Sequence, residues 1–579
     1  MQPERPVCDA LSCSLAAMRV SQLLFLISPA PSLAASAADW ATRSIYQLVT
    51  DRFALPSSSA SVPCDTGNRT FCGGSWTGIT NHLDYIQSMG FDAIWISPIA
   101  TNVEGTAYGD GYHGYWSLDI DTPSPRFGTA GDLKKLSKAL HERGMYLMLD
   151  VVVNHFAAPP LKSTPTSTLS APSSISTTSP EYAASAADLI LNYTNLAPFS
   201  SPTDFHQPCF IIDYTNQSDV EQCWLGDPSL PLPDLNTEDN DVQQRMYSWV
   251  KTMVKEYDAD GVRIDTVKHV RKDFWRGFSD SAGVFTLGEV LTDNATYVAS
   301  YIGDAVDAVL EYPAWYALIT AFASTNGNLS ALLATPSLNT LAASTTSLNG
   351  SAALTASFLE NHDQPRFPSL TSDTALLMNA MVWPFVADGI PILYYGQEQG
   401  YQGAVDPSNR EALWLSGYRS DKPLVAHVTS LNAARKLAMA GNKTFLERRS
   451  QWLPQPDPSS IMLSKHPLLA LLTNIGAGTN STAQPRWRIP AGTYPANTTL
   501  VDVLACERVQ IGSNATADTT IYATGGLPKV LLPATMLHKN GGACPALAMG
   551  KSDAVRIRSW LSAIVTVVAV VAVGVLGIS

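Results

Sequence analysis

Four apolar, strand-like runs in this chain end in ionisable side chains, and they restrict the fold more than any other feature. They are LMLDVVVNH, GVRIDTVKH, VFTLGEV and ASFLENHDQPRF, which begin at residues 147, 261, 284 and 356. In the second run, the two-residue repeat of a strand places Arg263 and Asp265 on one face and Val262 and Ile264 on the other. Taken alone, this stretch could hold an ordinary buried ion pair. Four such ends in one chain indicate a shared use, because unpaired buried charge is costly.

Strand and helix patterns alternate along most of the chain. The strand-like stretches are 44–53, 91–99, 145–153, 261–265, 284–290, 305–312, 354–363 and 389–398. Buried strands that alternate with helices indicate a parallel sheet. Acids at the C-terminal ends of several strands are how a (β/α)8 barrel assembles a catalytic face. We therefore expect an α/β protein with a TIM (β/α)8 barrel built from residues 38–154 and 235–443.

Two further regions depart from this alternation. Between residues 155 and 234 the regularity breaks, which predicts an excursion domain after the third barrel strand. Its Ser/Thr/Pro-rich insertion at 157–180 cannot bury much apolar surface. From 444 to 547, short β-type runs separated by turns predict an antiparallel C-terminal β-sandwich domain.

Both ends of the chain resemble processing signals. Residues 1–37 are expected to be a signal peptide with an A-x-A cleavage site, and its true initiator could be Met18. Residues 548–579 form a spacer and an apolar tail of the type that directs attachment of a glycosylphosphatidylinositol (GPI) anchor. Gly550 and Ser552 are the candidate attachment sites. A plain membrane anchor is the alternative interpretation.

Charge and sequons agree with an extracellular protein at the cell surface or in the cell wall. The formal net charge of −13 argues against a nucleic-acid partner. A GPI anchor would tie the protein to the plasma membrane. Ten Asn-x-Ser/Thr sequons predict a glycoprotein. They lie at Asn68, Asn192, Asn216, Asn294, Asn328, Asn349, Asn442, Asn480, Asn497 and Asn514.

Removal of the signal peptide leaves six of the eight cysteines, an even number that suits an oxidising compartment. Six cysteines allow many connectivities, and sequence spacing is the only local guide. Pairing of nearest neighbours predicts three disulfides, which are Cys64–Cys72, Cys209–Cys223 and Cys506–Cys544.

The acids at the strand ends suit the cleavage of a glycosidic bond, which uses two carboxyl groups on either side of the anomeric carbon. Asp265 is the stronger candidate for the nucleophile, because Arg263 can keep it ionised and lower its pKa. Glu289 follows an apolar run and is the better candidate for the proton donor. Three polar side chains could stabilise ring charge or hold hydroxyl groups: Asp363, His155 and His362. A histidine at a strand end, taken alone, is more often a packed hydrogen-bonding residue.

The motifs DVVVNH, GVRIDTVKH, GEV and FLENHDQPRF, in this order, resemble the four hallmark regions of the α-amylase family, glycoside hydrolase family 13. PLPDLN at 231–236 resembles the fifth region of that family. Stretches such as YGDGYHGYW, CWLGD, GIPILYYGQEQ and PSNREALWLSGY resemble secreted and GPI-anchored fungal α-amylases. The resemblance runs from about residue 39 to residue 544, which is nearly the whole mature chain.

The resemblance implies a role for each matching residue. Asp265 would be the nucleophile, Glu289 the acid/base and Asp363 the transition-state stabiliser, with Arg263 orienting Asp265. The implied substrate-binding residues are His155 and His362 in the cleaved subsite, Tyr115 stacked on that sugar beside His113 and Trp116, Lys268 and His269 on the leaving-group side, and Asp406 and Arg410 at the far end of the cleaved unit.

The resemblance also implies a structural calcium ion between the barrel and the excursion domain. Its ligands would be Asn154, Glu221, Asp234 and the backbone carbonyl of His269, and hard oxygen ligands suit Ca2+. The alternative for the two acids is an ordinary solvated loop. The chain departs from its relatives in the insertion after His155, in the missing disulfide of the second half of the barrel, and in a threonine after GEVL where relatives usually carry an acid.

Three functions remain open on the sequence alone. The first is a retaining α-amylase that cuts internal α-1,4-glucosidic bonds in starch-like α-glucan. The second is a cell-wall α-1,4-glucanotransferase that uses the same site and resolves the intermediate with a sugar hydroxyl instead of water. The third is an inactive glucan-binding wall protein, against which the intact set of three acids argues. In each case we expect a monomer whose partner is an α-glucan.

Overall fold

The computed structural model of the chain describes residues 35–57, 62–162, 178–345, 354–478, 484–514, 516–537, 543–544 and 547. Most of the expected signal peptide, the middle of the Ser/Thr/Pro-rich insertion and the whole C-terminal tail lie outside these ranges. The signal and the anchor therefore stay predictions. Within the described ranges, no helix combines the length and the apolar content needed to cross a membrane.

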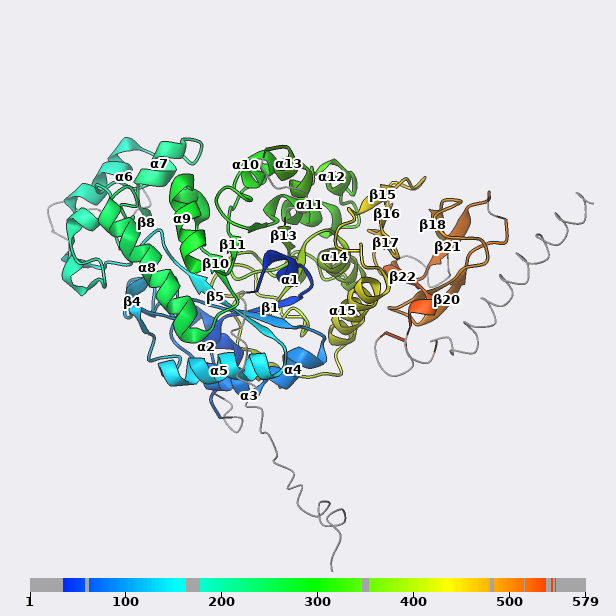
Figure 1. Cartoon of the computed structure of the whole chain (residues 1–579), viewed down its shortest axis with the longest axis horizontal. Coiled ribbons are helices and arrows are strands. Elements are labelled where there is room, and N and C mark those ends of the chain that lie inside the picture. The colour runs from blue at the N-terminus through cyan, green and yellow to red at the C-terminus, as the bar shows by residue number, and fades with distance from the viewer. Residues whose placement is uncertain are drawn as a thin grey trace, which may run out of the picture. The chain divides into compact units, whose positions relative to one another are not determined.

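Eight parallel strands close into a barrel, and the expected (β/α)8 fold is confirmed (Figure 1). Around the barrel the strands are β1 (Ile45–Leu48), β14 (Ile390–Tyr394), β13 (Leu354–Ser357), β12 (Ala308–Leu310), β11 (Phe285–Gly288), β10 (Gly261–Ile264), β5 (Tyr146–Val151) and β2 (Ala93–Ile96). Each predicted strand contributes one of them. The first is shorter than expected. After β1, Thr50–Phe53 form the short helix α2, in which buried Asp51 and Arg52 form an ion pair.

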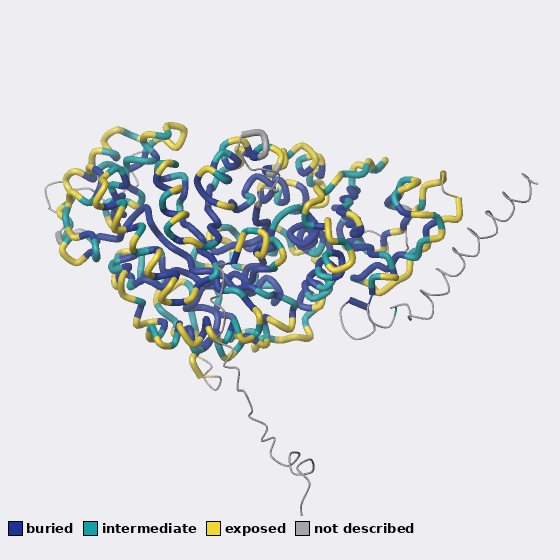
Figure 2. Tube along the Cα trace, in the orientation of Figure 1, coloured by how far each residue is buried: buried dark blue, intermediate teal, exposed yellow. Residues whose placement is uncertain are grey.

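Alternating strand residues fill two apolar layers, as the two-residue period of a strand requires. Val262 and Ile264 face outward into the large core beneath the helices. Trp95, Met148 and Leu287 belong to a second cluster that contains only barrel strands and their neighbours. Arg263 lies on the opposite face from Val262 and Ile264, as the alternation predicted. Figure 2 shows the barrel strands as a continuous buried region.

Helices cover the barrel. The longer ones are α5 (Ala130–Glu142), α8 (Asn240–Tyr257), α9 (Lys272–Ala282), α11 (Tyr312–Phe322), α14 (Thr374–Val386) and α15 (Pro423–Gly441); shorter ones are α1 (Ala37–Ala41), α3 (Trp76–Asn81), α4 (Leu83–Ser88), α10 (Ala295–Ala299), α12 (Ser330–Ala334) and α13 (Leu338–Thr345). In α8, buried Val242, Met246, Val250 and Met253 recur at helical spacing. The side chain of Asp239 accepts the backbone N–H of Val242 and caps the helix.

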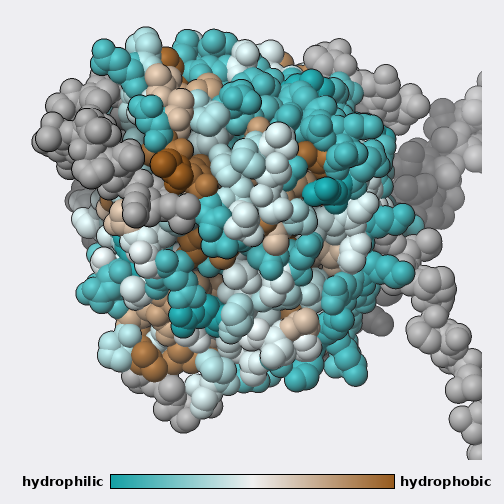
Figure 3. All heavy atoms as spheres, turned by 90° about the vertical axis from the view of Figure 1, so that its left-hand side faces the viewer, coloured by the Kyte–Doolittle hydropathy of each residue, from teal (hydrophilic) through white to brown (hydrophobic). Residues whose placement is uncertain are grey.

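The chain between β5 and α8 forms the predicted excursion from the barrel. Its elements are β6 (Pro160–Lys162), α6 (Pro180–Ala184), β7 (Ile190–Leu191), α7 (Gln217–Gln222), β8 (Leu225–Asp227) and β9 (Leu230–Leu232). The small hairpin of β3 (Ala100–Asn102) and β4 (Ser117–Pro123) precedes it, on the loop after β2. Such short elements bury little apolar surface, and the Cys209–Cys223 disulfide cross-links α7 to the segment before it. The face of the molecule in Figure 3 is mostly hydrophilic, with small separate hydrophobic patches.

The C-terminal region is the predicted antiparallel β-sandwich. One sheet has the order β15 (Gln451–Leu453), β16 (Ser460–Lys465), β17 (Leu468–Thr473), β22 (Lys529–Pro533), β19 (Thr499–Asp502) and β20 (Glu507–Gln510), and the other pairs β18 (Gln484–Ile489) with β21 (Thr519–Ala523). Leu469 and Leu531 of the first sheet pack with Trp487 and Ile521 of the second. The structure also joins Cys64 to Cys72 and Cys506 to Cys544, so all three expected disulfides form.

A buried asparagine on α14 joins the barrel to the β-sandwich. The Nδ2 of Asn379 donates to the carbonyl of Gly526 at 2.8 Å, and its Oδ1 accepts the N–H of Thr473 at 2.8 Å. Asn379 has no exposed surface, so water cannot replace either bond. The neighbouring ion pair of Lys465 and Asp388 reinforces the same contact.

Replacement of Asn379 by leucine should lower the free energy of unfolding by about 2–4 kcal/mol, because a buried N–H and a buried carbonyl lose their partners. Chemical denaturation monitored by tryptophan fluorescence measures the change. Asn514→Leu is the matched control, since this exposed side chain bonds only within its own turn. Equal stability of the two variants would contradict a structural role for Asn379.

Candidate active site

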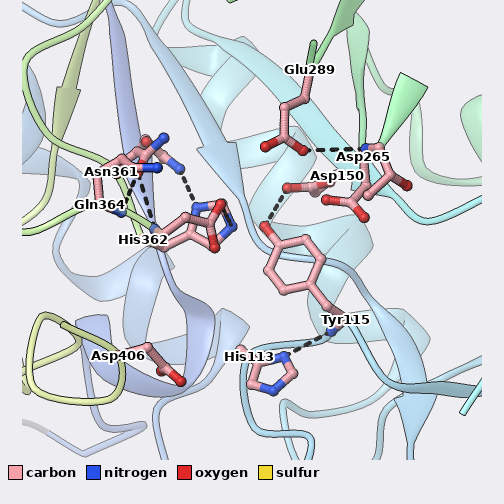
Figure 4. Close-up of polar contacts among 12 residues, drawn as sticks. His113, Tyr115, Asp150, Asp265, Glu289, Asn361, His362, Gln364 and Asp406 are labelled. Atoms are coloured by element: carbon pink, nitrogen blue, oxygen red, sulfur yellow. Dashed lines mark hydrogen bonds and ion pairs between the residues drawn. The ribbon is translucent and has the colours of Figure 1, made fainter. Parts of the chain in front are cut away.

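The ends of three neighbouring barrel strands bring the predicted acids together. Asp150 lies in β5 directly beside Arg263 of β10, Asp265 follows β10, and Glu289 follows β11. These strands run in the same direction, so the three carboxyl groups meet at one edge of the barrel. Figure 4 shows Asp150, Asp265 and Glu289 next to one another.

One guanidinium group contacts all three acids. The Nη1 of Arg263 lies 2.9 Å from Asp150 Oδ1 and 2.8 Å from Asp265 Oδ1, while its Nη2 lies 2.7 Å from Glu289 Oε2. The arginine side chain has no exposed surface, so these bonds take the place of its water shell. Three carboxyl groups therefore share a single buried cation.

Burial raises the pKa of Asp265 well above its ordinary value, and the neighbouring acids Glu289 and Asp150 act in the same direction. Arg263 opposes this and lowers the pKa, as the sequence led us to expect. The net direction is nevertheless upward, opposite to the expectation. The reason is that the carboxyl group is buried and shares one cation with two other acids.

Asp150 is an organising residue that the sequence analysis did not include among the site residues. Besides Arg263, it accepts a hydrogen bond from the hydroxyl of Tyr115 at 2.7 Å and one from Trp95 Nε1 at 2.9 Å. Burial raises the pKa of Asp150 to about 6, although Arg263 and these donors lower it. Asp150 thereby fixes both the central arginine and the tyrosine expected to stack on sugar. Its place at the end of LMLD, before the motif residues Asn154 and His155, was the available signal.

Glu289 is held from two further sides. Its Oε2 accepts the backbone N–H of Thr266 at 3.2 Å, and its Oε1 accepts the hydroxyl of Tyr312 at 3.3 Å. Asn361 in turn donates to the Tyr312 hydroxyl at 2.9 Å. Tyr312 carries no motif in the sequence and was missed. Strand β12 pairs directly with β11, but no pattern indicated that a side chain just after β12 reaches Glu289.

Across the site from the acids, His362 lies parallel to the ring of Tyr115, with 4.8 Å between ring centroids (Figure 4). Gln47 Nε2 lies 2.9 Å from its Nδ1. Burial and the nearby arginines lower the pKa of His362 well below its ordinary value, so it is a neutral hydrogen-bonding group. Its Nε2 lies 3.2 Å from Asp363, which faces the same space.

The residues expected at the far end of the cleaved unit, Asp406 and Arg410, also lie close together. Arg410 Nη1 lies 2.9 Å from Asp406 Oδ1, and Arg410 Nη2 lies 3.5 Å from Asp363 Oδ1. His113 accepts the backbone N–H of Tyr115 at 3.0 Å. Trp116 lies edge-on to His113, with 4.5 Å between centroids, and packs against the apolar cluster of Val103, Ala157, Leu230 and Leu232.

Lys268 and His269, which are expected on the leaving-group side, follow Asp265 in a short turn. Lys268 Nζ donates to the carbonyl of Leu291 at 2.9 Å, and His269 is buried. Tyr214 of the excursion lies beside them, 59% exposed, with its ring 5.3 Å from Lys268 Nζ. No pattern in the sequence pointed to Tyr214.

The expected calcium ligands have the chemistry that a hard cation requires. Asn154 Oδ1 and Asp234 Oδ1 are both buried and make no hydrogen bond. Burial raises the pKa of Asp234 to about 7, and the nearby Glu221 contributes. In the described part of the chain, no group of three or more His, Cys, Asp or Glu side chains forms a metal centre by itself. The expected set depends instead on amide and backbone oxygens as well as acids.

His155, next in the chain to Asn154, directs its Nε2 at the carbonyl of Tyr115, 3.1 Å away.

Two acids held by one arginine at the mouth of a (β/α)8 barrel are the arrangement of catalytic groups that a glycoside hydrolase requires. Comparison with known families identifies the family of glycoside hydrolases. The alpha amylase catalytic domain matches residues 47–424, and alpha-amylase domain C matches residues 457–549. The chain belongs to the α-amylase family of glycoside hydrolases.

Named relatives support the same assignment. Alpha-amylase 1 of Lipomyces kononenkoae is 46% identical over 412 residues, which span 71% of this chain and 61% of that protein. Alpha-amylase 2 of Schwanniomyces occidentalis is 38% identical over 540 residues, which span 92% of this chain and 98% of that protein. The solved structure of an alpha-amylase from Malbranchea cinnamomea is 39% identical, with a TM-score of 0.77, and the match covers 88% of this chain and 99% of that one.

Replacement of Asp150 by asparagine should lower kcat on soluble starch by about 100-fold, because Arg263 and Tyr115 lose a charged partner. The protein should remain folded, since asparagine has nearly the same shape. Steady-state kinetics and circular dichroism measure the two effects. Asp280→Asn, on the exposed end of α9, is the control. A variant at Asp150 with wild-type kcat would show that the arginine needs no support from β5.

Proposed function

We propose that this protein is a retaining α-amylase that cuts internal α-1,4-glucosidic bonds in starch-like α-glucan. The observation that carries the proposal is the contact of one guanidinium, that of Arg263, with both Asp265 and Glu289. Contact with the same guanidinium group supports a short distance between the carboxyl groups of these two acids. Retaining enzymes need about 5–5.5 Å between their carboxyl groups, whereas inverting enzymes leave roughly 6.5–9.5 Å for a water molecule.

The proposed reaction has two displacements. In the first, a carboxylate oxygen of Asp265 bonds to the anomeric carbon while the bond from that carbon to the leaving oxygen breaks. Glu289 transfers its proton to the leaving oxygen. In the second, water gives a proton to Glu289 and its oxygen bonds to the anomeric carbon, which releases Asp265. The hydrogen bonds from Thr266 and Tyr312 keep Glu289 pointed at the same place in both steps.

The remaining residues would hold the sugar that changes configuration. Tyr115 offers a ring face for stacking, and the neutral imidazoles of His155 and His362 suit hydroxyl groups. Asp363 would balance positive charge on the ring in the transition state. Asp406 and Arg410 would hold the far end of the cleaved unit, because an ion pair offers both donors and acceptors to hydroxyl groups.

A glucanotransferase remains the second candidate. Lys268 is bonded to the carbonyl of Leu291, and the neutral Thr292 follows where relatives usually carry an acid. A leaving-group side without that acid changes how an incoming hydroxyl is held. Transfer and hydrolysis share the first displacement and differ only in which molecule completes the second.

Incubation of the wild-type protein with maltoheptaose separates these candidates. Hydrolysis alone should produce only shorter oligosaccharides, while transfer should also produce longer ones. Glu289→Gln should lower the rate of both by about 1,000-fold, because the proton donor is lost. Chromatography of the products with time measures both quantities. Equal and negligible activity of the wild type and the variant would favour the inactive glucan-binding protein.

We also propose that Ca2+ is the structural metal of this chain and that Asn154, Glu221, Asp234 and the carbonyl of His269 hold it. The two buried oxygens without partners, on Asn154 and Asp234, support this. The ion would neutralise acids between the barrel and the excursion, and it takes no part in the reaction steps above.

Chelation of calcium should lower the free energy of unfolding by about 2–4 kcal/mol, because the folded state alone assembles the ligands. Thermal unfolding with EGTA, and again after return of Ca2+ or Mg2+, measures the effect. Only Ca2+ should restore the midpoint. Asp234→Asn should remove most of the response, and an unchanged midpoint in the wild type would end the calcium proposal.

For location, we propose a glycosylated protein of the cell surface or wall, tethered by a GPI anchor. Three disulfides support an oxidising compartment. Of the eight sequon asparagines at described positions, only Asn442 donates a hydrogen bond from Nδ2, the atom to which a glycan is attached. Release of the protein from cells by a phospholipase specific for GPI anchors tests the tether.

A further inference from the structure

The proposed leaving-group side of the site is built from residues that are far apart in the chain. We define the leaving-group wall as Tyr214, Lys268, His269 and Leu291. The aromatic ring of Tyr214 packs edge-on to His269 and near Lys268, and Lys268 is bonded to Leu291. The wall therefore combines the loop before α7 with the loops after β10 and β11. A contact between these loops is needed to fix their relative positions.

A single side-chain amide makes that connection. Gln217, the first residue of α7, donates from Nε2 to the carbonyl of Lys268 at 3.0 Å and to Glu221 Oε1 at 2.7 Å. Its Oε1 accepts the hydroxyl of Tyr297 at 2.6 Å. Both donor hydrogens and the acceptor of the amide are thus engaged, and each bond reaches a different structural element or turn.

Tyr297 anchors this amide from α10. Its hydroxyl also lies 2.9 Å from that of Tyr301, one helical turn later, and both hydroxyls are half-buried or buried. Lys272 of α9 lies 4.2 Å from the ring centroid of Tyr301 and bonds to Ser300. The position of α10 is therefore fixed from the barrel, and Tyr297 transmits it to Gln217.

We propose that Gln217 is a positioning residue that, with Tyr297, holds the leaving-group wall and so sets how the glycosyl intermediate divides between water and a sugar acceptor. The inference rests on the proposed function, since it concerns the second displacement. Gln217 touches no reacting atom. It acts through the backbone of Lys268, whose side chain lies on the path of the sugar that leaves or enters.

The physical reason is a difference in what the two acceptors need. Water reaches the anomeric carbon without help from the wall, whereas a sugar hydroxyl arrives correctly only if its ring is held. Loss of the amide would leave the carbonyl of Lys268, the carboxyl of Glu221 and the hydroxyl of Tyr297 to find new partners. The loop carrying Lys268 would then sample several positions, and transfer would weaken more than hydrolysis.

The test uses Gln217→Leu and Tyr297→Phe in the full-length protein with Ca2+ present. Tyr247→Phe is the matched control, because this half-buried tyrosine donates one hydrogen bond to the carbonyl of Phe274 at 2.9 Å, between α8 and α9. Two substrates are compared. Maltoheptaose places sugar rings on both sides of the cleaved bond, whereas a nitrophenyl maltotrioside that releases nitrophenol places none on the leaving-group wall.

Both variants should lower the ratio of transfer to hydrolysis, and kcat/KM for maltoheptaose, by about five- to tenfold. Values of kcat/KM for the nitrophenyl substrate should stay within about twofold of the wild type, and the control should change neither. A proportional loss on both substrates would overturn the inference, since that is what partial unfolding or a purely structural role produces. An unchanged product ratio in variants that remain folded would overturn it as well. Absence of any glucan cleavage by the wild type would instead defeat the proposed function.

Discussion

Arg263 is the interaction on which the rest of the site depends. A guanidinium with no exposed surface is tolerated only where acids replace its water shell, and here Asp150, Asp265 and Glu289 do so. They come from three adjacent strands, so the ion cluster exists only when β5, β10 and β11 pair in this register. Pairing of these three strands and assembly of the ion cluster are therefore one event. A shift of register by one residue would turn Arg263 towards the helices and leave its charge unpaired.

Much of this arrangement could be predicted, because it is carried by local patterns. The two-residue period of GVRID fixed the faces of Val262 and Arg263 without knowledge of neighbouring strands. The three disulfides followed from sequence spacing, since each joins two cysteines that are consecutive in the expected mature chain. The acids at strand ends were informative because parallel strands deliver their ends to one edge. Strand β1 was predicted too long because Asp51 and Arg52 leave the strand to form their own buried pair.

What the sequence did not reveal depends on contacts between side chains of different elements. Tyr312 meets Glu289, and Tyr297 meets Gln217, across elements whose separation in the chain carries no period or motif. The direction of the pKa of Asp265 was wrong for a related reason. A neighbouring arginine in the sequence suggests one ion pair, whereas the fold gives that arginine three partners and shields all of them from water. Charge sharing is a property of the assembled site, which pairwise reasoning from the sequence does not capture.

The two sides of the site are held by different kinds of interaction, and this difference suits the proposed reaction. Beyond Asp363, the chain uses charge, with Arg410 between Asp363 and Asp406 and Arg69 beside Asp406. On the proposed leaving-group side, two neutral side chains, Gln217 and Tyr297, support the backbone of Lys268 through hydrogen bonds, and one further bond of Gln217 reaches the carboxyl of Glu221. In the proposed mechanism, the covalently held part of the substrate has to stay in place through both displacements, which favours strong charged contacts. The other part has to leave and be replaced by water or a sugar, which requires a wall that binds weakly but is itself well positioned. A hydrogen-bonded support behind the wall, rather than more charge facing the substrate, meets both requirements.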